Sequence, residues 1–287
     1  MACDWLLVDG SSMIFRAFYG VPQDGARTRD GRLVNAVRGF LDRLARLIAQ
    51  RQPHRIAVAD DADWRPRWRV ELIPSYKTHR AGEPVPPALI PQLPIIRDLL
   101  AAVGVDMVGV PDYEAEDVIA TWSAHAGGSI EIVSGDRDLF ALIEDPRIAV
   151  LYPERAGLSV IDEAEVTRRY GVPGRHYADY AILRGDPSDG LPGLKGVGDK
   201  SAAQMVRRHG SVGAMLADPD ARLRDADRDY LTRALQVVPP RRDLQIALPE
   251  GRRAHYPADP ATLSALIERD GVDGPAARLV AALTATR

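Results

Sequence analysis

The sequence predicts an α/β fold in which helices flank a mostly parallel central sheet. Short apolar runs alternate along the chain with amphipathic helical patterns, and this alternation is typical of parallel sheets. Several apolar runs end in aspartate, which puts acidic side chains at the carboxyl ends of strands, where α/β proteins bind ligands. The chain has 287 residues, 46% of them hydrophobic, which is enough for a sizeable core.

The predicted elements follow from the spacing of apolar residues. Short buried runs predict strands at 4–9, 55–60, 105–110 and 130–134. Helical spacing predicts helices at 33–48, within 95–103, from about 114, at 177–183 and at 263–268. After about Tyr170 the strand signals fade, so the remainder is expected to be helices joined by turns.

One connection, residues 61–94, is long and broken by prolines. Connections of this length in a compact domain are usually functional or mobile. Aromatic residues interleave there with basic ones, which are Arg65, Arg67, Arg69, Lys77 and Arg80. This segment should therefore create a local positive field in a chain whose formal net charge is −3.

Composition excludes several classes of protein. The only cysteine, Cys3, rules out a disulfide framework and a cysteine-rich zinc site, and the six histidines lack metal-ligand spacing. The first residues, MACDWLLVDG, do not resemble a secretory signal. No stretch approaches the roughly 20 apolar residues that a membrane helix needs. We therefore expect a cytoplasmic protein without a membrane partner.

Acidic residues recur at predicted strand ends and helix starts. A single aspartate in such a place is usually a helix cap or turn former. Several carboxylates converging on one crevice, however, repel each other unless protons or cations neutralise them. Oxygen ligands select hard cations, so Mg²⁺ or Mn²⁺ is expected rather than zinc. The candidate ligands are Asp9, Asp60, Glu114, Glu116, Asp117, Asp136, Asp138, Asp186 and Asp189.

Spacing ranks some of these acids. In an ideal helix Glu114 and Asp117 share one face and Glu116 lies well around from Glu114, so geometry favours Asp117. Asp136 and Asp138 point the same way if the local backbone is extended. If that backbone is helical, one of the two is expected to be a cap.

The stretch 185–202, GDPSDGLPGLKGVGDKSA, combines acids with a glycine turn. Glycine permits tight turns whose N–H groups point into one concavity, and a helix beginning near Asp199 or Lys200 adds its dipole. These features suit a phosphodiester, although a plain loop between two helices is the alternative. The residues expected to contact it are Gly193, Lys195, Gly196, Gly198 and Lys200.

The order of the motifs resembles the flap endonuclease/5′-nuclease family. The closest resemblance is to its bacterial branch, which includes the 5′-3′ exonuclease domain of DNA polymerase I and stand-alone relatives. The motifs are LLVDG (6–10), RAF (16–18), SYKTHR (75–80), YEAEDV (113–118), GDRDL (135–139) and the stretch 185–202. The resemblance runs from about residue 6 to 216, and the last part of the chain matches weakly.

The resemblance implies an architecture and a set of cofactors. Residues 1–184 would form a PIN-like catalytic domain, with a helical arch at about 61–94. Residues 185–287 would form a helix-three-turn-helix DNA-binding module and a C-terminal helical region. The nine acids would bind two or more Mg²⁺ or Mn²⁺ ions, and the helix-three-turn-helix could hold K⁺.

The resemblance also implies roles for basic and aromatic residues. Arg69, Lys77 and Arg80 occupy basic positions of the arch. Arg69 is expected to contact DNA, and Lys77 and Arg80 would lie over the scissile phosphate. Arg16 and Phe18 fall near the entering strand, and Arg16 is expected to act in catalysis with Lys77 and Arg80. Tyr76 or Phe18 would stack on an unpaired base.

The implied activity is 5′-3′ exonuclease and flap endonuclease cleavage of DNA by two metal ions, in replication and repair. The expected substrates have 5′ ends, flaps or nicks, and the products carry a 5′-phosphate. We expect a monomer associated with the nucleoid, with a DNA polymerase or ligase as candidate partner. The alternatives are a non-catalytic DNA-structure-binding protein and a PIN-type ribonuclease.

Three positions depart from the family pattern. Glu116 stands where bacterial members usually have aspartate, and Gly190 replaces a common asparagine. Ala59 precedes Asp60 where the family tends to have an aromatic residue. None of these changes removes an expected ligand.

Overall fold

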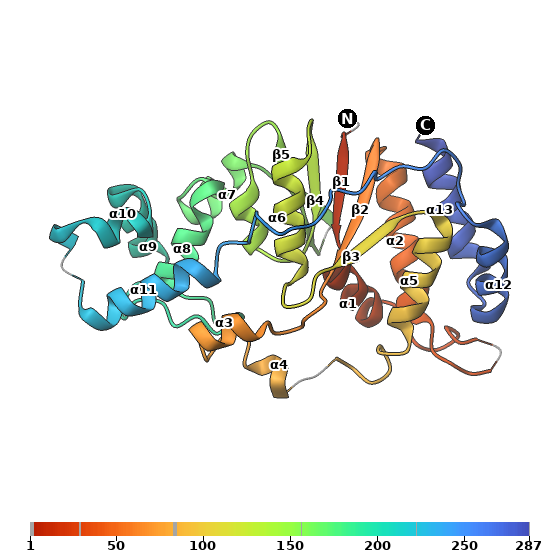
Figure 1. The fold of residues 1–287 in the computed structure, drawn as a ribbon, viewed down its shortest axis with the longest axis horizontal. Coiled ribbons are helices and arrows are strands. Elements are labelled where there is room, and N and C mark those ends of the chain that lie inside the picture. The colour runs from red at the N-terminus through yellow and green to blue at the C-terminus, as the bar shows by residue number, and fades with distance from the viewer. Residues whose placement is uncertain (1–2, 29, 83–84, 156, 222, 287) are drawn as a thin grey trace.

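The computed structural model describes residues 3–28, 30–82, 85–155, 157–221 and 223–286. Its centre is a six-stranded sheet in the order β3-β2-β1-β4-β5-β6 (Figure 1). All neighbouring strands pair in parallel except β6, which is antiparallel to β5. The predicted fold class is therefore confirmed. The strands are β1 (Trp5–Asp9), β2 (Arg55–Asp60), β3 (Asp106–Gly109), β4 (Ile130–Val133), β5 (Ile148–Glu154) and β6 (Gly157–Ile161).

The last two strands were missing from the sequence prediction. β5 contains an apolar run, IAVLY, that is an ordinary strand signal and should have been recognised. β6 is harder to predict because it lies at the edge of the sheet and is mostly exposed, so its sequence lacks a buried run.

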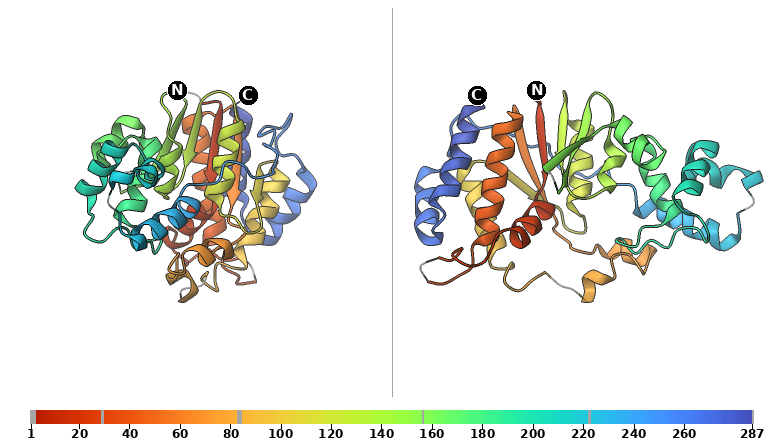
Figure 2. Two further views of the ribbon diagram at one scale, coloured as in Figure 1. Left: turned by 60° about the vertical axis from the view of Figure 1, so that its left-hand side comes forward. Right: turned by 180° about the vertical axis from the view of Figure 1, so that it is seen from behind.

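Helices cover both faces of the sheet and form two cores (Figure 2). One core involves α1 (Gly10–Gly20), α2 (Asn35–Arg51), α5 (Gln92–Val103), α12 (Pro260–Asp270) and α13 (Asp273–Ala285). The other involves α6 (Ala115–His125), η1 (Asp138–Leu142), α7 (Glu163–Tyr170), α8 (Tyr177–Arg184), α9 (Asp199–His209), α10 (Val212–Ala217) and α11 (Asp225–Val237). The short helix η2 (Gly174–His176) lies between α7 and α8. A short helix, η3 (Pro219–Ala221), lies between α10 and α11. None of the helices in the described ranges has the length and apolar character that a bilayer crossing requires.

The C-terminal part of the chain divides in two. Residues 185–237, called the C-terminal module below, extend from the sheet on one side, whereas α12 and α13 lie at the opposite end of the molecule (Figure 1). Leu279 and Leu283 of α13 belong to the same core as Leu44 of α2. The division of the chain at residue 184 stays a prediction.

The 61–94 connection crosses below the carboxyl ends of the strands (Figure 1). It contains α3 (Arg67–Leu72) and α4 (His79–Gly82), and its residues 83–84 lie outside the described ranges. Its central part packs against the C-terminal module, where the Lys77 N–H donates to the Asp189 carbonyl at 2.9 Å. Gly190 has φ +70°, and a Cβ there would lie 1.9 Å from the Ser75 carbonyl oxygen. The close approach explains why a side chain is missing at this departure from the family pattern.

We expect Gly190→Ala to be more destabilising than Gly196→Ala, a matched control. Both glycines have left-handed φ (+70° and +80°), but no atom lies within 4 Å of a Cβ at Gly196. Gly196→Ala should therefore lower the free energy of unfolding by about 1–2 kcal/mol, which is the cost of an L-residue in the left-handed region. Gly190→Ala should lose about 1–3 kcal/mol more, because it also overpacks the backbone contact. Urea unfolding measures both, and equal losses would contradict the contact.

Candidate active site

A cavity of about 440 Å³ lies at the carboxyl ends of the central strands, and we call it the acidic cavity. It gathers carboxylates from chain segments far apart in sequence: the ends of β1 and β2, the start of α6, the loop after β4, and the loop after α8. The acids that line it are Asp9, Asp61, Glu114, Glu116, Asp136, Asp138, Asp186 and Asp189. The structure thus brings together all the predicted acids except Asp60 and Asp117.

Three of these carboxylates form the tightest group. One oxygen from each of Glu116, Asp136 and Asp138 lies within 4.8 Å of the others. The loop after β4 is fixed locally: the Ser134 hydroxyl accepts from the Asp136 N–H at 2.9 Å, and Asp136 accepts from the Asp138 N–H at 2.9 Å. The N-cap residue of η1 is Arg137, so Asp136 precedes the helix, and neither Asp136 nor Asp138 is the cap expected for a helical backbone. An all-oxygen donor set of this kind fits a hard divalent cation.

Burial raises the pKa values of four acids in the cavity. Burial, and then the charge of Asp61, raise the pKa of Asp9 to about 7, although Ser134 donates to it at 2.5 Å. Burial, and then Glu114, raise the pKa of Asp61 to about 6. Burial raises the pKa of Glu116 and that of Asp138 well above their usual range. Cations that bind here would replace protons, so metal affinity should rise with pH.

The structure places Asp61, not Asp60, in the acidic cavity. Asp60 pairs with Arg97 at 2.6 Å and does not line the cavity, whereas Asp61 accepts from the Ala115 N–H at 2.8 Å. Strand parity explains this difference. Asp9 is the lateral partner of Ala59 in β2, and side chains two residues apart share a face. The register could have identified Asp61, but the sequence alone does not give the register.

Helical geometry favoured Asp117 over Glu116 as a cavity residue, but the structure places Glu116 in the acidic cavity and Asp117 outside it. Glu114 is the N-cap of α6 and is extended (φ −97°, ψ 164°), so helical periodicity does not apply from it. Asp117 is fully buried outside the cavity, where it accepts from the Glu114 N–H at 3.2 Å and the Arg241 N–H at 2.8 Å. Asp117 therefore stabilises the start of α6, and Glu116 faces the metal-binding group.

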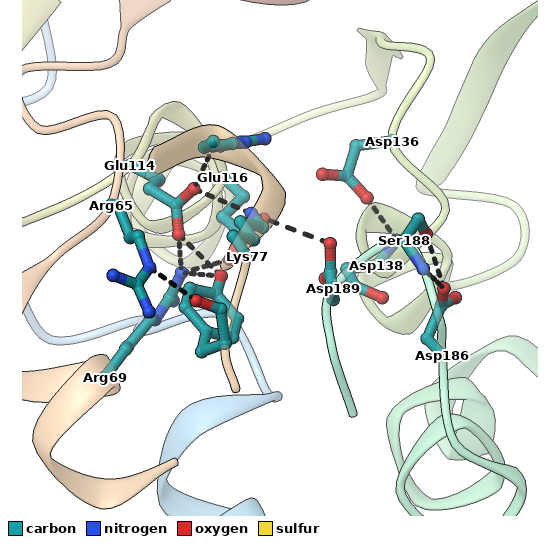
Figure 3. Close-up of polar contacts among 12 residues, drawn as sticks. Arg65, Arg69, Lys77, Glu114, Glu116, Asp136, Asp138, Asp186, Ser188 and Asp189 are labelled. Atoms are coloured by element: carbon teal, nitrogen blue, oxygen red, sulfur yellow. Dashed lines mark hydrogen bonds and ion pairs between the residues drawn. The ribbon is translucent and has the colours of Figure 1, made fainter. Parts of the chain in front are cut away.

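Arg69, predicted to contact DNA, is instead completely buried among carboxylates (Figure 3). Its guanidinium pairs with Glu116 at 2.6 Å, with Asp117 at 2.7 Å, and with Glu114. With no exposed surface it cannot reach a DNA backbone in this arrangement. Arg69 anchors α3 of the 61–94 connection to the start of α6.

Lys77 and Arg80 line the acidic cavity and both pair with Glu114. The Lys77 ammonium lies 2.7 Å from Glu114 Oε1, and Arg80 Nη1 lies 2.9 Å from the same oxygen. Burial opposes ionisation of Glu114, but the charges of Lys77 and then Arg69 hold its pKa at about 2. Glu114 is therefore ionised and already neutralised by protein cations, unlike its neighbours around Asp136.

The aromatic residues are placed differently from the expectation. The Phe18 ring is buried in the core of the α1 face, and the Tyr76 hydroxyl donates to Glu114 at 2.6 Å from a buried position. Neither ring is open to stack on a base. Phe15 lines the cavity instead, stacked on Trp64 with ring centroids 4.9 Å apart. Helical spacing along α1 would have distinguished the cavity-facing Phe15 from the buried Phe18, but α1 itself was not predicted from the sequence.

The glycine turn is exposed where a backbone could reach it. Lys195, Gly196 and Lys200 lie at the surface, and Gly198 is the N-cap of α9, which begins at Asp199 as expected. Gly193 differs, because a Cβ there would lie 2.5 Å from the Arg184 carbonyl group. Its role is close packing of the turn on α8.

We expect Arg69→Met to lose about 3–5 kcal/mol of unfolding free energy at pH 8, because it leaves buried carboxylates without their partner. The loss should be smaller at pH 5, where those carboxylates protonate more easily. The control is Arg67→Met, an exposed neighbour that pairs with exposed Glu71, which should change stability by less than about 1 kcal/mol. Urea unfolding at both pH values measures the effect, and a pH-independent loss would argue against the charge explanation.

Asp61→Asn should stabilise the metal-free protein at pH 8 but not at pH 4. The folded pKa of about 6 lies above the unfolded value, so the native state binds the extra proton and loses stability as pH rises from about 4 to 6. Asparagine cannot ionise, and the gain at pH 8 in EDTA should be on the order of 2 kcal/mol. Exposed Asp24 provides the control substitution. Equal gains at both pH values would contradict the assigned pKa.

Two family descriptions match consecutive parts of the chain. Residues 4–171 match the 5′-3′ exonuclease N-terminal resolvase-like domain, and residues 172–246 match the 5′-3′ exonuclease C-terminal SAM fold. Among solved structures, the bacteriophage T5 D15 protein co-crystallised with metal ions is similar in fold, with a TM-score of 0.68 at 15% identity over 97% of this chain and 99% of that one. Flap endonuclease-1 from Methanococcus jannaschii has a TM-score of 0.63 at 16% identity, covering 100% of this chain and 94% of that one.

Closer relatives by sequence are bacterial. A 5′-3′ exonuclease of Streptomyces coelicolor is 46% identical over 98% of this chain and 100% of its own length. A 5′-3′ exonuclease of Mycobacterium tuberculosis is 44% identical over 97% of each chain. DNA polymerase I of the same species is 39% identical over 75% of this chain, which corresponds to 24% of the polymerase. The chain belongs to the 5′-3′ exonuclease family.

Proposed function

We propose that the protein is a divalent-metal-dependent 5′-3′ exonuclease and structure-specific flap endonuclease that hydrolyses DNA with two metal ions. The observation that carries this proposal is the acidic cavity, in which oxygens of Glu116, Asp136 and Asp138 lie within 4.8 Å of one another. The full-length relatives named 5′-3′ exonucleases support the reaction. The metal-bound T5 D15 structure supports the cofactor.

The donors are suited to Mg²⁺ or Mn²⁺. Glu116, Asp136 and Asp138 would hold one ion, and Asp186 and Asp189 from the C-terminal module would contribute to a second. Bound ions would supply a water nucleophile of lowered pKa and stabilise the leaving oxygen. A K⁺ site at the glycine turn rests on the resemblance alone.

The basic wall of the cavity would act on the phosphate. Arg80 is partly exposed and its guanidinium lies 4.3 Å from the Trp64 ring centroid, which fixes its direction. Lys77 and Arg80 both pair with Glu114, so both cations are held in place before a phosphate enters the cavity. Donors held in place in this way stabilise charge that develops during the reaction. We retain Lys77 and Arg80 as catalytic candidates, whereas Arg16 lies outside the acidic cavity.

The substrate would be DNA bound through its backbone. Lys195, Lys200 and the N-terminus of α9 are exposed and can contact phosphates of a duplex, which carry no sequence information. The T5 D15 flap endonuclease and Rad2 have been solved with DNA, in agreement with this substrate class. We also propose a cytoplasmic monomer on nucleoid DNA that works beside a polymerase or ligase.

The two alternatives predict different behaviour. A DNA-structure-binding protein without chemistry would not need a complete cluster of buried, mutually repelling acids. A PIN-type ribonuclease would not need the C-terminal module with its glycine turn. Preferential cleavage of single-stranded RNA over a DNA flap would favour the ribonuclease.

Asp136→Ala should bind a 5′-flap DNA as tightly as the wild type but cut it at least about 100-fold more slowly, since even outer-shell metal partners contribute 10–100-fold. Cleavage is followed with a 5′-labelled flap in Mn²⁺, and binding is followed by anisotropy without divalent ions. Exposed Asp24→Ala serves as control and should cut normally. Normal cutting by Asp136→Ala, or no cutting by the wild type, would refute the proposed function.

A further inference from the structure

A second cavity of about 510 Å³ adjoins the acidic cavity, and we call it the arginine cavity. The two cavities share Ser12 and Gly135, which are joined by a hydrogen bond of 2.9 Å from the Gly135 N–H to the Ser12 hydroxyl. One wall carries guanidinium groups from α1 and α2, and another carries apolar side chains of β4, β5 and β6. These residues are Arg16, Arg43, Arg46, Val133, Leu151, Leu158 and Val160.

Three arginines of this cavity have no acidic partner among the described residues: Arg16, Arg43 and Arg46. The other charged residues of the cavity are satisfied, since Arg51 pairs with Glu131, and Glu154 pairs with Arg169 at 2.8 Å. Burial, and then the charge of Arg16, lower the pKa of Arg43. Grouped guanidinium ions without partners attract phosphate.

Gly20 contributes to the position of Arg43. A Cβ at Gly20 would lie 2.5 Å from Arg43 Nη2, so the absence of a side chain lets the guanidinium rest against the end of α1. Arg43 is half-buried, whereas Arg46 is exposed one turn along α2. The cluster is thus supported by packing on one side and open on the other.

The apolar wall is unusually open. Leu158 is 42% exposed and Val160 is 50% exposed, and both lie on β6, beyond the part of the sheet that α1 and α2 cover (Figure 2, right). A cationic wall facing an apolar wall suits a nucleotide, because its phosphate and its base need these two environments.

The arginine cavity and the C-terminal module lie on opposite faces of the sheet. Met13, Leu47, Val133 and Leu151 of the cavity belong to the core shared with α2, whereas the module packs into the core shared with α6. A strand that leaves a duplex held by the module and enters the acidic cavity, at the ends of the strands, meets the arginines next, because the two cavities adjoin at Ser12 and Gly135. The position therefore corresponds to single-stranded DNA beyond the scissile phosphate.

We propose that the arginine cavity binds the backbone and a base of the displaced 5′ single strand after it has passed the acidic cavity. Arg43 and Arg46 contact its phosphates, and Leu158 and Val160 contact a base. The inference rests on the proposed function and adds a subsite that orients the strand to be removed.

The test compares wild type with Arg43→Gln/Arg46→Gln on two DNAs, a 5′ flap of ten nucleotides and the same duplex with a nick. Anisotropy without divalent ions gives the dissociation constant over a range of salt concentrations. Loss of two single-strand phosphate contacts should make the slope of log affinity against log salt shallower by about 1.4 on the flap. Binding to the nicked duplex should not change.

The matched control is Arg55→Gln/Arg252→Gln, which removes the same charge from another surface. Neither arginine lines this cavity or has an acidic partner among the described residues. Equal loss by the control would mean that only net charge matters, and equal loss on flap and nick would mean duplex binding; either result overturns the inference. Failure of the wild type to cut any flap would instead refute the proposed function.

Neutral methylphosphonate linkages, introduced one at a time along the flap strand on both sides of the cleavage site, identify the phosphates concerned. Wild type should lose affinity at one or two positions on the 5′ side of the cut, and the double variant should be insensitive there. Sensitivity that persists in the variant, or that appears only on the 3′ side, would overturn the assignment.

Discussion

The ion pairs of Glu114 are the interaction on which the site depends. This carboxylate begins α6 and receives Arg69, Lys77 and Arg80, all from the 61–94 connection. Buried charges of this kind are tolerable only when they are paired and hydrogen-bonded. The connection, the helix start and the acidic cavity are therefore held together by one network, and the position of the basic wall relative to the acids is set before any substrate arrives.

The network also divides the cavity into two electrostatic regions. Around Glu114 protein cations compensate the negative charge, whereas around Glu116, Asp136 and Asp138 the charge is only partly compensated. The Arg69 contact to Glu116 connects the two regions, and Lys77, which pairs with Glu114, also lies 4.0 Å from Asp189. Divalent ions would bind in the second region because protein cations do not fill it, and phosphate would bind beside the first.

The sequence predicts the parallel sheet and most of the acids, because apolar runs ending in aspartate carry both signals. It does not separate Asp60 from Asp61 or Asp117 from Glu116, since those choices depend on strand register and on the extended N-cap of α6. Nor does the sequence show that Arg69 and Tyr76 are buried, because basic and aromatic residues in such a segment are also typical of a DNA-binding surface. The unpredicted β5 and β6 form most of the apolar wall beside Arg43, together with Val133 of β4.

The two C-terminal helices have a consequence for how the protein can be shortened. They cover α2 and α5 at the end of the molecule away from the C-terminal module, and they contribute Leu263, Leu266 and Leu279 to that core. A chain truncated before Pro260 would keep every acid of the cavity but would expose a broad apolar surface on α2 and α5. Such a chain would aggregate, and a measurement of activity alone would not distinguish aggregation from loss of the catalytic residues.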